Sequence, residues 1–183
     1  MLRSVGRMIA RGSLAIGFVL VAGSGTASAQ KVGDKAPPFS LQGSDGKTYT
    51  LDQFKGKSAV VLAWFPKADT PGCTKECKSI RDSSKELREL NVAYFTISVD
   101  KPEDNKKFAE KYDLDYPILS DPTRSVAGSY GVLLGSRPFA ARWTFYIDKD
   151  GIIREIDRTV NQRVDQAGSD IVAKVKELGL ASK

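Results

Sequence analysis

Residues 59–77 have the sequence AVVLAWFPKADTPGCTKEC and hold both cysteines of the chain. The apolar run before Pro66 predicts a buried strand, and the polar segment from Cys73 to Leu90 has the periodicity of a helix. Its inward-facing stripe is predicted to contain Cys73, Cys77, Ile80, Ser84 and Leu87. Unpaired N–H groups at the start of a helix favour an anion, so this strand-to-helix turn favours the thiolate, the reactive form of cysteine.

Hydrophobic patterning predicts strands and helices in alternation along the rest of the chain. Asp-Gly turns predict two hairpins, one over residues 39–51 and one over residues 143–156. Further strands are predicted at residues 92–99 and 117–119, and further helices at residues 102–112, 121–131 and 164–178. This alternation implies an α/β domain with a central mixed sheet covered by helices on both faces. The final antiparallel hairpin followed by a helix is similar to the end of the thioredoxin-like fold, and the chain has an additional N-terminal hairpin.

Residues 1–29 have the layout of a secretory signal peptide. Three arginines and no acidic residue precede or border an apolar stretch from Ser13 to Gly23, and Ala27-Ser28-Ala29 fits a cleavage site. The apolar stretch is about half of the roughly 20 residues that span a bilayer, so a stable membrane anchor is not expected. We expect export to the periplasm and a mature domain of residues 30–183, with an uncleaved anchor and a mitochondrial-type presequence as the alternatives.

Charge and cysteine content narrow the classes of function. The leader holds three of the 28 Lys and Arg residues and none of the 22 acidic ones, so the net charge of +6 falls to +3 for residues 30–183. Basic residues are scattered, and no nucleic-acid partner is expected. Absence of histidine excludes a histidine-dependent nucleophile. Two cysteines separated by three residues would close a very short loop, so the pair suits redox chemistry better than stabilisation.

A wider pattern surrounds the first cysteine. Pro66, Thr70 and Cys73 form Pro-x3-Thr-x2-Cys, and Arg142 stands far along the chain in the segment Arg142-Trp143-Thr144-Phe145. Over about residues 32–178 the chain resembles the peroxiredoxins of the AhpC/TSA superfamily, in particular the bacterioferritin-comigratory or peroxiredoxin Q group. Other segments that carry this resemblance are residues 65–67, 70–76, 107–112, 120–122 and 146–151.

The resemblance implies a thioredoxin-like fold and a thiol-dependent peroxidase. Cys73 would be the catalytic nucleophile that attacks a peroxide and becomes a sulfenic acid. Arg142 would stabilise the thiolate and the charge developing on oxygen, while Thr70 would hold peroxide and thiolate and Pro66 would shield the thiolate from water. The implied reductant is a thioredoxin-like protein or a small thiol. No cofactor and no metal are implied, and the relatives suggest a monomer or weak dimer.

Cys77 is the candidate resolving cysteine, which would form a disulfide with Cys73. Members of the group that carry a resolving cysteine in this helix usually have it five residues after the nucleophile, whereas here position 78 is Lys and the cysteine comes after four. In an intact helix that spacing is roughly 6 Å along the axis. This is near the upper limit for a disulfide, so the first helical turn is predicted to unwind when the bond forms. Otherwise an external thiol must resolve the sulfenic acid.

Several alternatives stay open on the sequence alone. An exported thiol-disulfide oxidoreductase usually has Cys-x-x-Cys, one residue shorter than the spacing here. A copper-binding thioredoxin-like protein would share Cys-x3-Cys but would normally add a histidine, which this chain lacks. Among single residues, Cys77 can be a packed core thiol, Arg142 an ordinary ion-pairing residue, and Thr70 a helix cap.

Overall fold

The computed structural model describes Met1 and residues 30–181, so the leader expected at residues 1–29 lies, apart from Met1, outside the described residues. The elements in chain order are β1 (Ser40–Gly43), β2 (Thr48–Thr50), η1 (Leu51–Gln53), β3 (Val60–Trp64), α1 (Pro71–Asp82), α2 (Ser84–Glu89), β4 (Ala93–Ser98), α3 (Pro102–Lys111), β5 (Ile118–Ser120), α4 (Ser125–Ser129), β6 (Thr144–Ile147), β7 (Ile153–Asp157), η2 (Val160–Gln162) and α5 (Ala167–Glu177). None of the helices formed by these residues has the length and hydropathy of a membrane span.

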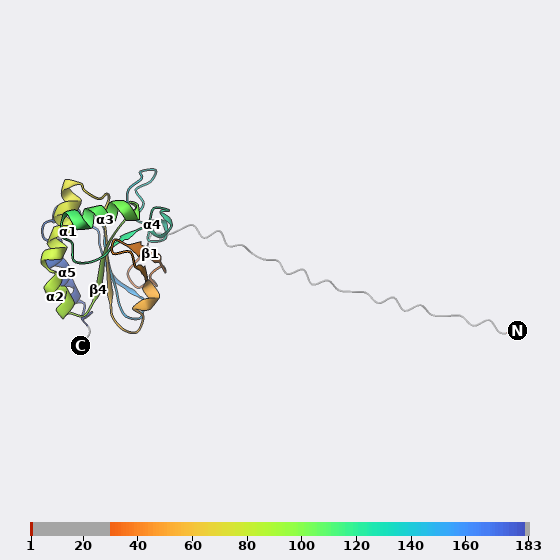
Figure 1. Cartoon of the computed structure of the whole chain (residues 1–183). Helices are drawn as coiled ribbons and strands as arrows, with labels where there is room; N and C mark the ends of the chain where they lie inside the picture. Colours follow the sequence, from red (N-terminus) through yellow and green to blue (C-terminus); the bar gives the residue numbers. More distant parts are fainter. Residues whose placement is uncertain (2–29, 182–183) are drawn as a thin grey trace.

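A seven-stranded sheet forms the centre of the domain, in the order β2-β1-β5-β4-β3-β6-β7. Strands β3, β4 and β5 run parallel, and the other neighbouring pairs are antiparallel. Both hairpins predicted from Asp-Gly turns are present, as β1–β2 and β6–β7. The mixed sheet and its helices confirm the α/β, thioredoxin-like architecture expected from the sequence (Figure 1).

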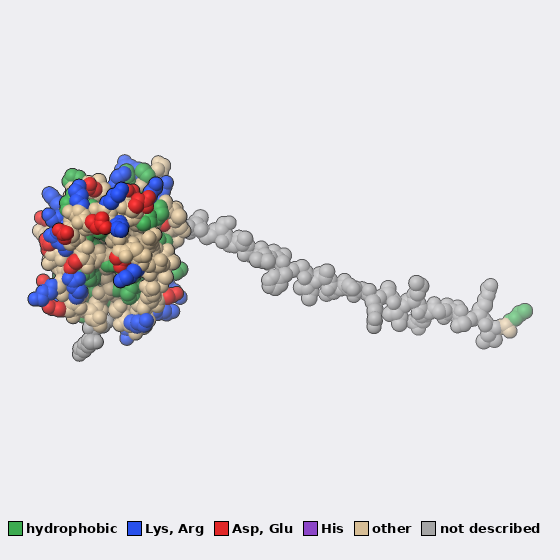
Figure 2. Space-filling model, viewed as in Figure 1, with side chains coloured by type: hydrophobic (Ala, Val, Ile, Leu, Met, Phe, Trp, Pro, Cys, Tyr) green, Lys and Arg blue, Asp and Glu red, His purple; other side chains and the backbone are tan. Residues whose placement is uncertain are grey.

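Strand β3 separates the two halves of the core, because alternate side chains of a strand point to opposite faces. Val61 and Ala63 pack into the cluster beneath α1, α2 and α5, whereas Val60, Leu62 and Trp64 pack toward the face that carries α4. Figure 1 shows α1, α2 and α5 together on one side of the sheet and α4 on the other. On the outer surface, basic and acidic side chains are interspersed over the visible face (Figure 2).

The segment from Cys73 to Leu90 was predicted as one continuous helix but forms two helices. The prediction that the segment is helical is correct. Ser83, with φ −96° and ψ 2°, separates α1 from α2. The Ser84 hydroxyl donates to Asp115 at 2.6 Å, which supplies a contact outside the helix at the break. All five residues predicted on the inward stripe are buried, so the periodicity was interpreted correctly.

Two helices begin later than predicted. The Asp121 carboxylate accepts a hydrogen bond from the Ala127 N–H at 2.8 Å, and Arg124 has φ 62°, so residues 121–124 form a turn and α4 begins at Ser125. The last helix begins at Ala167, and Val164 lies before it, in the connection that follows η2. A side-chain bond such as that of Asp121 competes with helix formation, and periodicity does not report it.

Candidate active site

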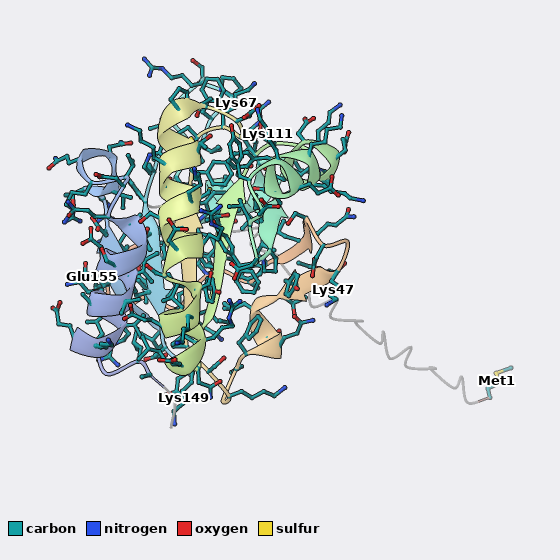
Figure 3. The ribbon with its side chains drawn as sticks, turned by 60° about the vertical axis from the view of Figure 1, so that its left-hand side comes forward. Met1, Lys47, Lys67, Lys111, Lys149 and Glu155 are labelled. Atoms are coloured by element: carbon teal, nitrogen blue, oxygen red, sulfur yellow. The ribbon has the colours of Figure 1, made fainter. Side chains whose placement is uncertain are left out.

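Cys73 lies in the first turn of α1, at the end of the molecule where β3 ends. Thr70 occupies the N-cap position with an extended backbone, and Pro71 follows at the first helical position, where proline is well suited. The Cys73 side chain is 1% exposed. Figure 3 shows Lys67 and Lys111 near this end of α1, with Lys149 at the opposite end of the molecule. The thiol therefore sits where the helix dipole and free N–H groups favour negative charge.

Arg142 brings a buried cation to the thiol from a distant part of the chain. Its Nη2 lies 3.1 Å from the Cys73 Sγ, and its Nε donates to Asn161 Oδ1 at 2.8 Å. The residue precedes β6 by two positions, in the connection that leads into that strand. The Trp64 N–H donates to the Trp143 carbonyl at 2.9 Å, and this bond holds the arginine's segment beside the end of β3. Only 6% of Arg142 is exposed, so its charge acts in a weakly screened environment.

The loop between β3 and α1 carries Pro66 and Thr70, and Asp69 anchors it. Asp69 has φ 58°, in the left-handed region that aspartate tolerates better than most residues. Its carboxylate accepts bonds from Lys111 Nζ at 2.8 Å and from the Tyr112 hydroxyl at 2.9 Å. The hydrogen bond from Lys111 is the main reason that the pKa of Asp69 is lowered. The end of α3 thus fixes the residue that precedes Thr70.

Thr70 and Pro66 belong to the loop that leads into the helix of Cys73. The Thr70 hydroxyl does not cap α1 but donates to the Lys67 carbonyl at 3.0 Å, so its lone pairs are the part that can accept a further bond. Pro66 is half-buried, lies two residues after the end of β3, and offers no N–H.

Glu76 is a member of the site that the sequence analysis missed. It is 0% exposed, and its Oε2 forms an ion pair with Arg142 Nη1, while Oε1 has no partner within the described structure. Burial raises the pKa of Glu76 to about 7, although the charge of Arg142 opposes this effect. The sequence does indicate that Glu76 is buried, because position 76 follows Cys73 by three residues and so falls on the same inward stripe. No local sequence pattern indicates that Asn161 belongs to the site, since only the folded chain brings η2 to Arg142.

Comparison with known proteins identifies the family to which this arrangement belongs. The model of the AhpC/TSA family matches residues 32–156, which include Pro66, Thr70, Cys73 and Arg142. The chain belongs to the AhpC/TSA family. It is 36% identical over 151 residues to a putative peroxiredoxin bcp of Coxiella burnetii, covering 79% of this chain and 98% of the relative. It is 40% identical over 133 residues to the peroxiredoxin Bcp of Escherichia coli strain K12, covering 69% of this chain and 84% of that one.

A solved structure agrees with these relatives. The crystal structure of the peroxidoxin BcpB from Mycobacterium tuberculosis superposes with a TM-score of 0.72 and 34% identity, over 80% of this chain and 97% of the other. The resemblance stated from the sequence motifs is therefore confirmed, and so is the thioredoxin-like fold. The chain is a peroxiredoxin, an oxidoreductase of the thiol peroxidase class.

The second cysteine of this peroxiredoxin is buried one turn farther along α1. Both thiols are free, and Cys77 is 0% exposed. Burial, with the neighbouring Glu76 carboxylate, raises the pKa of the Cys77 thiol well above its usual range. In this conformation Cys77 is thus held as a neutral thiol within the core, and a role in resolution requires it to move. Among the residues that the structure describes, no cluster of three acidic or sulfur ligands is arranged for a metal ion.

Proposed function

We propose that Cys73 is the nucleophile with which this peroxiredoxin reduces hydrogen peroxide or organic hydroperoxides. The observation that supports this assignment is the 3.1 Å approach of Arg142 Nη2 to the Cys73 Sγ inside a buried site. The Cys73 thiolate attacks one peroxide oxygen in line with the O–O bond. That bond breaks, the second oxygen leaves as hydroxide or alkoxide and takes up the proton that Cys73 released on ionisation, giving water or an alcohol, and Cys73 is oxidised by two electrons to a sulfenic acid.

The neighbouring residues have distinct parts in this step. Arg142 stays charged at all relevant pH values and donates from a rigid fork, so it stabilises both the thiolate and the negative charge that develops on the leaving oxygen. Thr70 accepts a hydrogen bond from the peroxide through its lone pairs, while Pro66 excludes water from one side of the thiolate. Glu76 and Asn161 hold the guanidinium in place, and we regard them as positioning residues.

Resolution by Cys77 is the second part of the proposal. The Cys77 sulfur attacks the Cys73 sulfur, the S–O bond breaks, and hydroxide leaves with the Cys77 proton as water while the S–S bond forms. Burial of Cys77 and its four-residue spacing from Cys73 support the expectation that α1 unwinds locally during this step. A thioredoxin-like protein or a small thiol then reduces the disulfide and completes the cycle.

Steady-state peroxide consumption by the protein with a dithiol reductant tests these assignments. Cys73→Ser should abolish activity, because no other thiolate replaces it. Cys77→Ser should keep the first turnover but make later turnovers depend on an added small thiol. Unchanged recycling of Cys77→Ser by a thioredoxin would show that an external thiol resolves the sulfenic acid, while activity that survives Cys73→Ser would remove the assignment of the nucleophile.

We further propose that residues 1–29 direct export and are then removed. The folded contacts support this boundary, because the Gln30 side chain donates to the Ser129 carbonyl at 2.9 Å and its carbonyl accepts a bond from Arg158 at 3.2 Å. The intact mass of the protein recovered from a periplasmic extract should correspond to a chain that begins at Gln30. Recovery of the full-length chain from the cytoplasm would contradict the proposal.

A further inference from the structure

Tyr116 makes a buried hydrogen bond to the backbone of the proposed resolving cysteine. It lies just before β5, and its hydroxyl donates to the Cys77 carbonyl at 2.9 Å. Both residues are buried, and the Tyr116 ring packs against Tyr94 with 5.5 Å between ring centroids. Water cannot readily replace this bond, so it stabilises the folded helix at the residue that must move during resolution.

The surroundings hold Tyr116 and the second half of α1 in fixed relation to each other. Arg81 Nη1 donates to the Tyr112 carbonyl at 2.8 Å, a few residues before Tyr116. On the side of α5, a Cβ added to Gly168 would lie 2.1 Å from the Ser79 carbonyl oxygen, which shows how closely the two helices approach. The helix beyond Cys77 is therefore anchored on both sides. Movement is left to the first turns, up to and including Cys77.

Disulfide formation requires Cys77 to leave this arrangement. Its side chain has to turn from the core toward Cys73, and rotation of its backbone carries the carbonyl away from the Tyr116 hydroxyl. We propose that Tyr116 is a positioning residue that keeps α1 folded at Cys77 and thereby sets the rate at which the Cys73 sulfenic acid is resolved. This inference rests on the proposed resolution by Cys77.

A slow resolution step has a chemical consequence, because a competing reaction consumes the same intermediate. The sulfenic sulfur of Cys73 can attack a second peroxide molecule; the O–O bond breaks, water or an alcohol leaves, and the sulfur gains an oxygen as sulfinic acid. The Tyr116 hydrogen bond therefore favours this overoxidation over disulfide formation. Its removal should shift the balance toward the disulfide by about fivefold, the effect of one typical buried hydrogen bond.

The variant Tyr116→Phe, compared with wild type and Tyr130→Phe, tests this inference. Tyr130 is a matched control, since it is also buried and donates to a backbone carbonyl, that of Pro37, at 2.9 Å, but lies on the other face of the sheet. Reduced proteins are mixed with hydrogen peroxide, quenched by alkylation at successive times, and analysed by mass spectrometry for the Cys73–Cys77 disulfide and the Cys73 sulfinic acid. Amide hydrogen exchange in residues 73–77 of the reduced proteins gives a second readout.

Tyr116→Phe should form the disulfide about fivefold faster, accumulate less sulfinic acid, and exchange amides 73–77 faster, while Tyr130→Phe matches wild type. Equal rates of disulfide formation in Tyr116→Phe and wild type would overturn the role of Tyr116 and leave resolution by Cys77 intact. Absence of the disulfide in wild type, with peroxide still consumed, would overturn both. Equal acceleration in the two tyrosine variants would show a general loss of stability and contradict a specific role.

Discussion

Arg142 faces two groups that can carry negative charge, the Cys73 sulfur at 3.1 Å from its Nη2 and the Glu76 carboxylate that pairs with its Nη1. Because the guanidinium is buried, neither interaction is strongly screened by water. The charge that Glu76 carries therefore determines how much of the positive potential of Arg142 is available to the sulfur. The charge states of Glu76 and Cys73 are therefore coupled through Arg142.

Removal of Arg142 should slow the oxidation of Cys73 by peroxide more than it weakens the binding of peroxide. Arg142→Ala is expected to slow oxidation of the reduced protein by hydrogen peroxide by about 100-fold or more, the usual cost of losing a charge-stabilising donor. Arg142→Lys keeps the charge but not the fork that reaches Cys73 and Glu76 together, so it should give an intermediate rate. Stopped-flow tryptophan fluorescence would measure these rates. A wild-type rate in Arg142→Ala would remove this residue from the mechanism.

Glu76 should give the stability of the protein a characteristic pH dependence. Its raised pKa means that the folded state binds more protons than the unfolded state between about pH 4.5 and 7, so stability falls as pH rises through that window. Glu76→Gln keeps the shape of the side chain and should flatten the profile. The chain has no histidine, the side chain that ordinarily titrates in this range.

Urea unfolding at a series of pH values would measure this effect. The control is Glu86→Gln, since Glu86 is exposed and its pair with Lys176, at 3.6 Å, lies on the surface. That variant should follow the wild-type profile. An identical slope in Glu76→Gln and wild type would contradict a protonated Glu76 in the folded state.

Asp69 should influence peroxide reduction through the position of Thr70. Asp69→Ala loses the bonds to Lys111 and Tyr112 and places alanine at φ 58°, so the loop before α1 should loosen and the rate of peroxide reduction should fall several-fold. Asp69→Asn, which tolerates this backbone and can still accept from Tyr112, should lose less. If Asp69→Ala reacts with peroxide as fast as wild type, the loop does not depend on this anchor.

Gly168 should be needed for the packing of α5 on α1. In Gly168→Ala the new Cβ would overlap the Ser79 carbonyl oxygen, so the helices must separate, and destabilisation of about 1–3 kcal/mol is expected for such overpacking. Ser169→Ala, at the adjacent exposed position, should have little effect on chemical denaturation. Equal stability of the two variants would show that the helix contact can relax.

The sequence was sufficient to predict most strands and both hairpins, because these depend on local patterns. Alternation and apolar runs predicted the strands, whereas the pairing of Cys73 with Arg142, 69 residues away, followed from the resemblance to peroxiredoxins. Other features that depend on long-range contacts were missed. The helix break at Ser83 accompanies the hydrogen bond from Ser84 to Asp115, and Asn161 reaches Arg142 only through the fold.

Glu76 was missed for a different reason. A charged residue in a polar helix is usually solvated, so its place on the inward stripe was not interpreted as burial. Its buried partner Arg142 is 66 residues away, and no local pattern reports such a pair. The Tyr116 contact with Cys77 spans 39 residues and was equally hidden from local patterns.

The central claim is that peroxide oxidises the sulfur of Cys73. A single-turnover experiment tests this claim most directly. Reduced Cys77→Ser protein is given one equivalent of hydrogen peroxide without reductant, and the product is trapped with a sulfenic-acid reagent and located by peptide mass spectrometry. The reagent should be found on Cys73 in near-stoichiometric amount, and Cys73→Ser should consume no peroxide. Peroxide consumption by Cys73→Ser at the wild-type rate, or an unlabelled Cys73 after peroxide is consumed, would contradict the account.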